Sequence, residues 1–250
     1  MKLLQLNIYR GKYIAPVIDF VKKNDIDILI FQEVSGGAIS FNRKDDFAYL
    51  KHVLSYEGVL TITMSLRHDT RSYFGNATLF KPSFHLKDTD VLWLEKYRET
   101  ISYHNNDFTR IPRNALFVSL EKDGRIINTI NTHFAWSVPP VDTEYKEKMG
   151  RSLLSFAKSQ KGLSVLSGDF NLPLDSQIIQ SFKEFGANLV EKNEITNTLN
   201  PHVHRAEHLF PEGLAVDFVF VNEKIKVEKF SVVDRPDLSD HLGLLLEFTV

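Results

Sequence analysis

The sequence of 250 residues contains no cysteine, which excludes disulfide bridges, a thiolate zinc site and a cysteine nucleophile. It also lacks an apolar run of the roughly 18 to 20 residues that span a bilayer. The longest apolar segments lie at residues 28–31 and 242–246. The opening residues, MKLLQLNIYRG, are too short and too polar for a secretion signal. We therefore expect a cytoplasmic protein that makes no stable insertion into a membrane.

An excess of positive charge is missing as well. The chain carries 30 Lys and Arg residues against 32 Asp and Glu residues, a formal net charge of -2. Proteins that hold nucleic acid mainly by neutralising phosphates tend to be basic, so any basic surface on this protein must be local. The composition therefore argues against tight, processive binding to long duplexes.

The chain is long enough to fold without a disulfide bridge or a structural metal ion. A protein of this length buries roughly three quarters of the surface that its unfolded chain exposes. Any bound metal should therefore be functional. No internal repeat, low-complexity tract or Pro/Gly/Ser linker interrupts the sequence. We expect a single domain over residues 1–250 and a monomer.

The hydropathy pattern predicts many strands and few helices. Residues 4–8 alternate between apolar and polar side chains, residues 14–21 have helical spacing, and residues 27–34 form a largely apolar strand. Further strands are predicted at residues 59–65, 74–80, 114–121, 126–134, 163–167, 216–221, 226–233 and 242–248. Apolar stripes predict helices within residues 145–156 and 178–185. This mixed order indicates an α/β or α+β layered domain in which sheets pack on one another.

Polar residues that can bind a hard cation or move a proton stand at the ends of these strands. Asn7, Glu33 and His133 each lie near the end of one strand, SGDFN follows another at residues 167–171, and SDH precedes the last at residues 239–241. Taken singly, each has a structural explanation as a cap, an Asx-turn or a packed histidine. Their conjunction in one chain indicates a shared role, because ligand sites in layered α/β folds are assembled from strand-end loops.

These motifs resemble those of the endonuclease/exonuclease/phosphatase superfamily of metal-dependent phosphodiesterases. The resemblance spans nearly the whole chain and rests on LNIYRG, FQEV, FGNATL, NTHF, SGDFNLP, VDFVFV and LSDHLGLLLEF. The last motif looks closest to tyrosyl-DNA phosphodiesterase-like and generic bacterial members. The resemblance implies a deoxyribonuclease-like α/β fold, a layered sandwich of two mixed β-sheets flanked by helices. That expectation agrees with the independent strand pattern.

The resemblance also implies a metal site. Glu33 would be the principal carboxylate ligand of a Mg²⁺ ion, with Asn7 and Asp240 beside it, and Mn²⁺ would be a possible substitute. Mg²⁺ prefers oxygen ligands in octahedral geometry and keeps several waters, so one or two carboxylates and an amide suffice.

The catalytic residues implied by the resemblance surround that metal. Asp169 and Asn171 would position or deprotonate the attacking water, and His241 would act as general base or contact the phosphate. Either Asp169 or His241 could take the proton. Asp217 in VDFVFV would bond the catalytic histidine, fix its tautomer and favour its protonated state.

His133 in NTHF matches deoxyribonuclease-like, sphingomyelinase-like and tyrosyl-DNA phosphodiesterase-like members, whereas abasic-site endonucleases usually have tyrosine there. It is therefore a further expected catalytic residue. Arg113 matches a phosphate-contacting arginine of deoxyribonuclease-like members, and the alternative is an exposed Arg that flanks a strand. Asn76 in FGNATL is a weaker candidate for contact with the substrate phosphate. Residues 213–216, GLAV, lack the arginine that abasic-site endonucleases and 5-phosphatases commonly carry there.

Three functions are compatible with this pattern. The leading one is Mg²⁺-dependent hydrolysis of phosphodiester bonds with nucleic acid as a transient substrate, either as a nuclease or as a DNA-end-processing enzyme. The second keeps the site for a small or lipid phosphoester, and the third is a binding protein that has lost catalysis. Residues 36–46, 67–73, 88–113 and 196–212 are expected loops that would select the substrate, and they have no readable pattern. Four aromatic residues could stack on bases or pack internally: Trp93, Tyr97, Tyr103 and Trp136.

A histidine cluster in PHVHRAEH has two interpretations. His202, His204 and His208 could bind zinc, since three imidazoles fall within seven residues. We favour a polar loop that borders the substrate site, because no helical or strand period aligns the three side chains.

Overall fold

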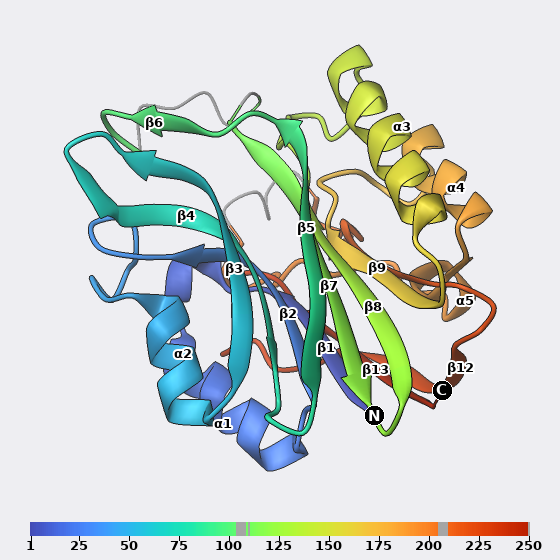
Figure 1. Cartoon of the computed structure of the whole chain (residues 1–250). Coiled ribbons are helices and arrows are strands. Elements are labelled where there is room, and N and C mark those ends of the chain that lie inside the picture. The colour runs from blue at the N-terminus through green and yellow to red at the C-terminus, as the bar shows by residue number, and fades with distance from the viewer. Residues whose placement is uncertain (104–108, 110, 205–209, 250) are drawn as a thin grey trace.

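The computed structural model describes residues 1–103, 109, 111–204 and 210–249, and two mixed β-sheets packed face to face form its centre (Figure 1). The prediction of a layered sandwich flanked by helices is confirmed. None of the helices in these described ranges is long and apolar enough to cross a membrane.

The first sheet has seven strands. Their spatial order is β12 (Lys226–Val233), β13 (Gly243–Thr249), β1 (Lys2–Asn7), β2 (Ile28–Ser35), β4 (Asp69–Phe80), β3 (Glu57–Leu66) and β6 (Arg98–Thr100). The β1–β2 and β3–β6 pairs are parallel, and the other pairs are antiparallel.

The second sheet has six strands. Their order is β10 (Ala187–Asn188), β11 (Asp217–Val221), β9 (Leu163–Asp169), β8 (Arg125–His133), β7 (Arg113–Lys122) and β5 (His85–Glu95). Only β8 and β9 are paired in parallel within this sheet as described.

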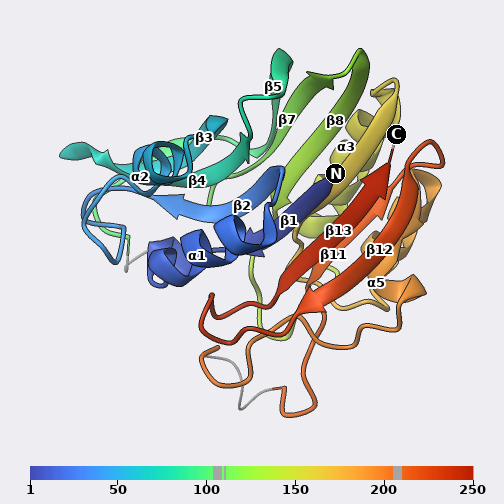
Figure 2. The same ribbon diagram turned by 90° about the horizontal axis from the view of Figure 1, so that it is seen from below.

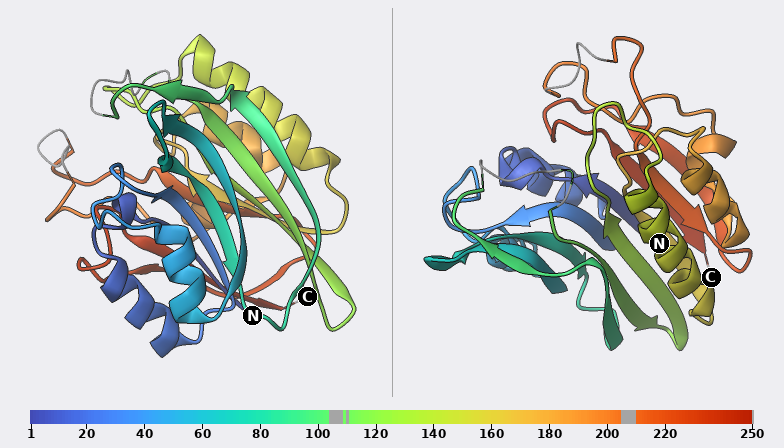
Figure 3. Two further views of the ribbon diagram at one scale, coloured as in Figure 1. Left: turned by 60° about the vertical axis from the view of Figure 1, so that its left-hand side comes forward. Right: turned by 90° about the horizontal axis from the view of Figure 1, so that it is seen from above.

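Helices cover the outer faces of the sandwich (Figure 2; Figure 3). The first sheet carries α1 (Ile14–Asn24) and α2 (Asp46–Leu54), and the second carries α3 (Glu144–Ser159), α4 (Gln177–Ser181) and α5 (Leu189–Lys192). Short 3-10 turns lie at η1 (Tyr9–Gly11) and η2 (Phe182–Glu184).

Strand periodicity explains how the first sheet has two buried faces. Leu3 and Ile30 belong to the hydrophobic core between the sheets, whereas Leu4 and Leu29 pack with the apolar stripe of α1 on the opposite face. Successive side chains of a strand point to opposite faces, so one strand contributes to both cores.

The chain termini lie together at one end, where the N-terminal amine of Met1 donates to the carbonyl of Phe248 at 2.7 Å.

Two expectations about loops are corrected. Residues 88–113 contain most of the 11-residue strand β5 and all of β6, and residues 69–73 of the expected loop 67–73 belong to β4. Most of β5 is exposed, because it is the edge strand of the second sheet and carries charged residues outward. Its sequence therefore lacks the apolar pattern of a central strand.

Candidate active site

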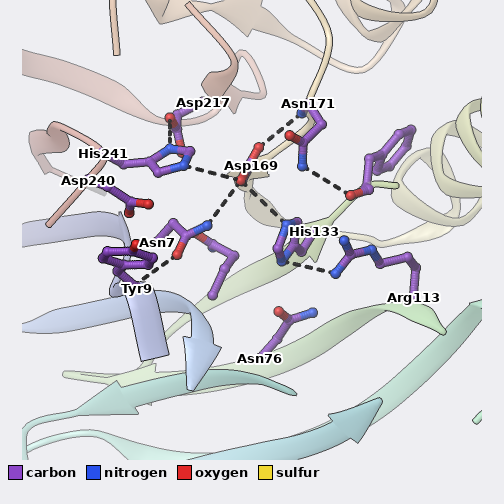
Figure 4. A network of polar contacts seen from close by, with 12 residues as sticks. Asn7, Tyr9, Asn76, Arg113, His133, Asp169, Asn171, Asp217, Asp240 and His241 are labelled. Carbon is purple, nitrogen blue, oxygen red and sulfur yellow. Dashed lines mark hydrogen bonds and ion pairs between the residues drawn. The ribbon is translucent and has the colours of Figure 1, made fainter. Parts of the chain in front are cut away.

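Strand ends from both sheets bring the polar motifs to the end of the sandwich opposite the termini (Figure 4). In the parallel β8–β9 pair, His133 is in register with Asp169, and the antiparallel β9–β11 pair places Asp217 opposite Asp169. Asn7 ends β1 in the facing sheet. The pairing of these strands therefore brings residues that are far apart in the sequence into one cluster.

Asp169 is the centre of this cluster. Its Oδ2 accepts a hydrogen bond from Nδ2 of Asn7 at 3.1 Å and lies 3.4 Å from Nε2 of His133 and 3.7 Å from Nε2 of His241. Its Oδ1 accepts from the backbone N–H of Asn171 at 3.0 Å. Burial raises the pKa of Asp169 to about 6, against the opposing effect of the His241 charge. The carboxylate is thus fixed in place and can accept a proton near neutral pH.

His241 and Asp217 form a buried pair. Nδ1 of His241 lies 2.8 Å from Oδ2 of Asp217, and the same oxygen accepts from Oγ1 of Thr198 at 2.8 Å. Gln5 donates to the other oxygen of Asp217 at 2.8 Å. Burial alone lowers the pKa of His241, but the charges of Asp217, Asp169 and then Asp240 outweigh it and raise the pKa well above 6.5. The surrounding carboxylates therefore favour the cationic form of His241.

His133 has the opposite electrostatic character. Its Nδ1 lies 3.3 Å from Nη1 of Arg113, which can only donate, and its Nε2 faces Asp169. Burial, with the charges of Arg113 and His241, lowers the pKa of His133 well below 6.5. The pKa values of these two neighbouring imidazoles thus shift in opposite directions, because the charged groups around them differ.

Arg113 is buried and not the exposed strand-flanking residue of the alternative interpretation. Its side chain is 2% exposed, and within the described part of the chain its Nε has no hydrogen-bond partner. Burial lowers its pKa, and the charges of Glu33 and Asp169 oppose that effect. A buried guanidinium with an unused N–H is suited to bind an anion.

Glu33 is placed by an irregularity in β2. The β2–β4 pairing shifts register between Phe31 and Val34, and Glu33 has a positive φ of 57° inside this bulge. A β-bulge re-aims a side chain, and a non-glycine residue at positive φ is held there by its surroundings. Burial raises the pKa of Glu33, while the positive charge of Arg10 lowers it.

Asp240 is a further carboxylate of the site in which burial disfavours the charged form, as in Asp169 and Glu33. Burial raises its pKa to about 6, and the negative charge of Glu33 adds to the shift. Ser239 donates from Oγ to Oδ1 of Asp240 at 3.2 Å. The Nδ2 of Asn7 donates to Asp169, and its Oδ1 accepts from the N–H of Tyr9 at 3.1 Å (Figure 4). Crowded carboxylates and an amide oxygen are the donor set that a hard divalent cation requires.

The buried side chain of Phe170 anchors the turn GDFN, residues 168–171. Phe170 is fully buried between Asp169 and Asn171 and packs against four other rings at centroid distances of 5.1 to 5.9 Å. The glycine is required because a Cβ at Gly168 would lie 1.9 Å from the carbonyl oxygen of Thr132. The close approach of β8 and β9 therefore fixes where Asp169 emerges.

Asn171 has a visible structural role. It adopts a positive φ of 49°, and its Nδ2 donates to the carbonyl of Phe134 at 3.2 Å. Its own carbonyl accepts from Nζ of Lys146 at 3.0 Å. These bonds hold the turn that presents Asp169.

Sequence reasoning missed Lys146 and Arg10. Lys146 is 1% exposed, also donates to Oγ of Ser137 at 2.8 Å, and has a pKa lowered to about 8 by burial. A lysine three residues before Met149 on the apolar stripe of α3 was the available signal. Arg10 is 6% exposed, and its guanidinium lies 4.2 Å from the ring centroid of Phe41 and 4.7 Å from that of Tyr103.

Asn76 is less closely connected to the cluster. Its amide donates to Oδ1 of Asn114 at 3.0 Å, in the polar layer between the two sheets. The three histidines of PHVHRAEH do not lie in one place. The ring of His204 packs edge-on against that of His241 with a centroid distance of 5.5 Å, and His202 is exposed. His208 lies outside the described residues.

Comparison with known proteins agrees with this geometry. The model of the Endonuclease/Exonuclease/phosphatase family matches residues 4–241. The chain belongs to this family and has the phosphoester hydrolase architecture that defines it. No curated protein sequence gave a match.

Solved structures with the same fold cover the whole chain. An endonuclease/exonuclease/phosphatase from Bacteroides vulgatus is 19% identical with a TM-score of 0.72, covering 100% of this chain and 98% of that one. A mannosyl-6-phosphatase from Bacteroides thetaiotaomicron is 16% identical with a TM-score of 0.69, covering 100% of both chains. The catalytic domain of human Nocturnin with a bound sulfate anion is 17% identical with a TM-score of 0.70, covering 100% and 94%. At these identities the likeness shows the fold alone.

Proposed function

We propose that this protein is a Mg²⁺-dependent hydrolase of phosphodiester bonds. The observation that carries the proposal is the position of Asp169, whose Oδ2 lies 3.4 Å from His133 and 3.7 Å from His241. A carboxylate beside a cationic imidazole provides an acceptor for a proton of water and a donor for a phosphate oxygen. The pair supports in-line attack of that water on phosphorus.

The oxygen donors at the site fit Mg²⁺. We assign Glu33 as the principal ligand, with Asp240 and the amide oxygen of Asn7 beside it, and Mn²⁺ as a substitute. Burial raises the pKa of both carboxyl groups, and the negative charge of Asp169 on Glu33 and of Glu33 on Asp240 adds to it. A bound cation would offset this accumulation of negative charge. When bound, Mg²⁺ would polarise a phosphoryl oxygen and stabilise developing charge.

The protonation states favour Asp169 over His241 as the base. Asp169, with a pKa of about 6, is mostly ionised at neutral pH and can take a proton, whereas His241 already carries one. In this assignment Asn171 helps to position the water, and His241 donates to the phosphate. Asp217 keeps His241 charged and oriented through the 2.8 Å bond to Nδ1.

Arg113 and His133 form the opposite side of the site. The Nε of Arg113, which has no hydrogen-bond partner among the described residues, supports contact with a phosphate oxygen. The bond from Arg113 fixes the His133 ring with its Nε2 toward Asp169. Asn76 stays a weaker prediction for phosphate contact, because its amide is already used by Asn114.

Nucleic acid is the proposed substrate. Trp93 and Tyr97 form an edge-to-face pair with centroids 6.4 Å apart, and they are 40% and 43% exposed. Trp93 is in register with Asn114, which follows Arg113 on β7, and Glu95 is in register with Arg113 itself. Exposed rings next to a phosphate-binding arginine can stack a base joined to that phosphate. The charge balance supports transient action on ends or short strands, and the lack of cysteine supports a cytoplasmic setting.

A parallel assay in Mg²⁺ tests the substrate class. We expect faster hydrolysis of single-stranded DNA or a 5′-tyrosyl oligonucleotide than of sphingomyelin or mannose 6-phosphate. Trp93→Ala should raise KM for the oligonucleotide about tenfold, since stacking contributes roughly 1–3 kcal/mol per base. Leu86→Ala is the matched control, because Leu86 is exposed on the same strand. Preferential cleavage of sphingomyelin would refute the nucleic-acid assignment.

A small phosphoester is the second candidate. The near balance of charge favours it, since the chain has no overall positive field for a long polyanion. It predicts that mannose 6-phosphate is the best substrate of the panel and that Trp93→Ala leaves KM unchanged.

A further inference from the structure

A second group of ligands lies next to the proposed catalytic metal site. One ligand atom each from His204, Asp240 and His241 lies within 4.8 Å of the other two. The His204 ring packs edge-on against that of His241 with a centroid distance of 5.5 Å. His204 comes from the segment before β11, so it is not part of the strand-end motifs that form the catalytic cluster.

Backbone hydrogen bonds join the two segments that carry these ligands. The N–H of His204 donates to the carbonyl of Asn200 at 2.9 Å, and the N–H of Asn200 donates to the carbonyl of Asp240 at 2.9 Å. Nδ2 of Asn200 donates to the carbonyl of Ser239 at 2.6 Å, and Leu199 forms a bridge with His241. Asn200 therefore fixes the spacing between His204 and Asp240.

The donor set differs in chemistry from the oxygen set around Glu33. Two imidazole nitrogens and one carboxylate oxygen suit Zn²⁺, whereas Mg²⁺ prefers oxygen and water. The Nδ1 atom of His241 is held by Asp217 at 2.8 Å, which leaves Nε2 as its ligand atom. A carboxylate behind a metal-binding histidine is the usual supporting contact of zinc sites. Zinc–ligand bonds of about 2.0–2.2 Å require the three ligand atoms to close in by roughly an ångström.

We propose that His204, Asp240 and His241 form a zinc site whose occupancy inhibits the enzyme. The inhibitory part rests on the proposed function, because Zn²⁺ would bind the Nε2 of His241, releasing its proton to solvent, together with a carboxylate oxygen of Asp240. His241 could then no longer donate to the phosphate, and Asp240 would be shared with the Mg²⁺ site.

Calorimetric titration of the metal-free protein with Zn²⁺ tests the site without reference to activity. We expect one zinc per chain, and binding weakened about tenfold or more by His204→Ala. His202→Ala is the matched control, since His202 is exposed on the same segment. It should bind as the wild type does. Equal zinc affinity of the wild type and His204→Ala, or weakening by His202→Ala alone, would overturn the proposal.

Inhibition is measured separately at a fixed Mg²⁺ concentration. The Zn²⁺ concentration that halves hydrolysis should rise about tenfold or more in His204→Ala, each protein being referred to its own zinc-free rate. Equal inhibition of both proteins, or activation by Zn²⁺, would contradict the inhibitory role. An enzyme inactive with every metal would instead contradict the proposed function, and calorimetry would still decide the zinc site.

Discussion

Nδ1 of His241 lies 2.8 Å from Oδ2 of Asp217, and the two side chains are 5% and 0% exposed. The pairing joins the segment just before β13 of the first sheet to the first residue of β11 in the second. It sets both the orientation of the imidazole and its positive charge. The proposed mechanism therefore depends on a residue that need not touch the substrate.

Replacement of Asp217 by Asn should lower kcat by about 10²-fold or more, because the imidazole loses the charge that keeps it cationic and oriented. Steady-state kinetics and circular dichroism check the activity and the fold together. Asp234→Asn, at an exposed position, is the control. Near-wild-type turnover with an intact fold would rule out the assigned role of Asp217.

Mg²⁺ should stabilise the protein through Glu33. A ligand at 100 times its Kd adds about 2.7 kcal/mol to the free energy of unfolding, so Mg²⁺ should raise the Tm of the wild type. In Glu33→Gln that increase should be largely lost, because the principal carboxylate ligand is gone. Glu57→Gln, at an exposed carboxylate, should keep it. An undiminished increase in Glu33→Gln would place the metal elsewhere.

Asp46 should make stability depend on pH. It is fully buried, accepts from Oγ of Ser35 and of Ser40 at 3.0 Å each, and has a pKa raised by burial from 3.8 to about 6. Between these two pH values the folded state binds more protons than the unfolded state, so the free energy of unfolding should fall as pH rises. The contribution is about 3 kcal/mol at most.

Denaturant unfolding at pH 4.5 and pH 7 of the wild type and Asp46→Asn measures this contribution. The variant should lose most of the decrease that Asp46 causes on going to pH 7. Asp45→Asn, which keeps an N-cap side chain on α2, should retain the wild-type dependence. Identical pH dependence in wild type and Asp46→Asn would show that Asp46 does not titrate in this range.

Lys146 should support catalysis through the Asn171 turn. Lys146→Met removes the 3.0 Å bond to the Asn171 carbonyl and should lower kcat about tenfold with little change in KM, a positioning effect. Lys148→Met changes an exposed lysine on the same helix and should have no effect. A higher KM at constant kcat would instead indicate that Lys146 contacts the substrate.

The sequence predicted the central strands and the edge strand β12 at residues 226–233, but not the edge strands β5, β6 and β10. The alternation at Leu4 and Leu6 is visible because one face of β1 meets α1 and the other meets the second sheet. The edge strand β5 carries charges outward, so no apolar period marks it. Short or exposed elements depend on tertiary pairing that local sequence does not encode.

The candidate site was likewise only partly predictable from the sequence. Motifs and resemblance located Asp169, Asp217 and His241, because each stands beside a clear strand. The bulge that turns Glu33 at φ 57° and the contact of His204 with His241 arise from packing between distant segments. Periodicity contains no information on such contacts.

The most direct test of the central claim is the Mg²⁺ dependence of phosphodiester hydrolysis by the wild type and by Asp169→Asn. Release of nitrophenol from bis(nitrophenyl) phosphate can be followed as Mg²⁺ is added to metal-free protein. We predict that hydrolysis by the wild type requires Mg²⁺ and that Asp169→Asn is slower by about 10²-fold or more. Hydrolysis by Asp169→Asn at the wild-type rate, or no Mg²⁺-dependent hydrolysis by the wild type, would contradict it.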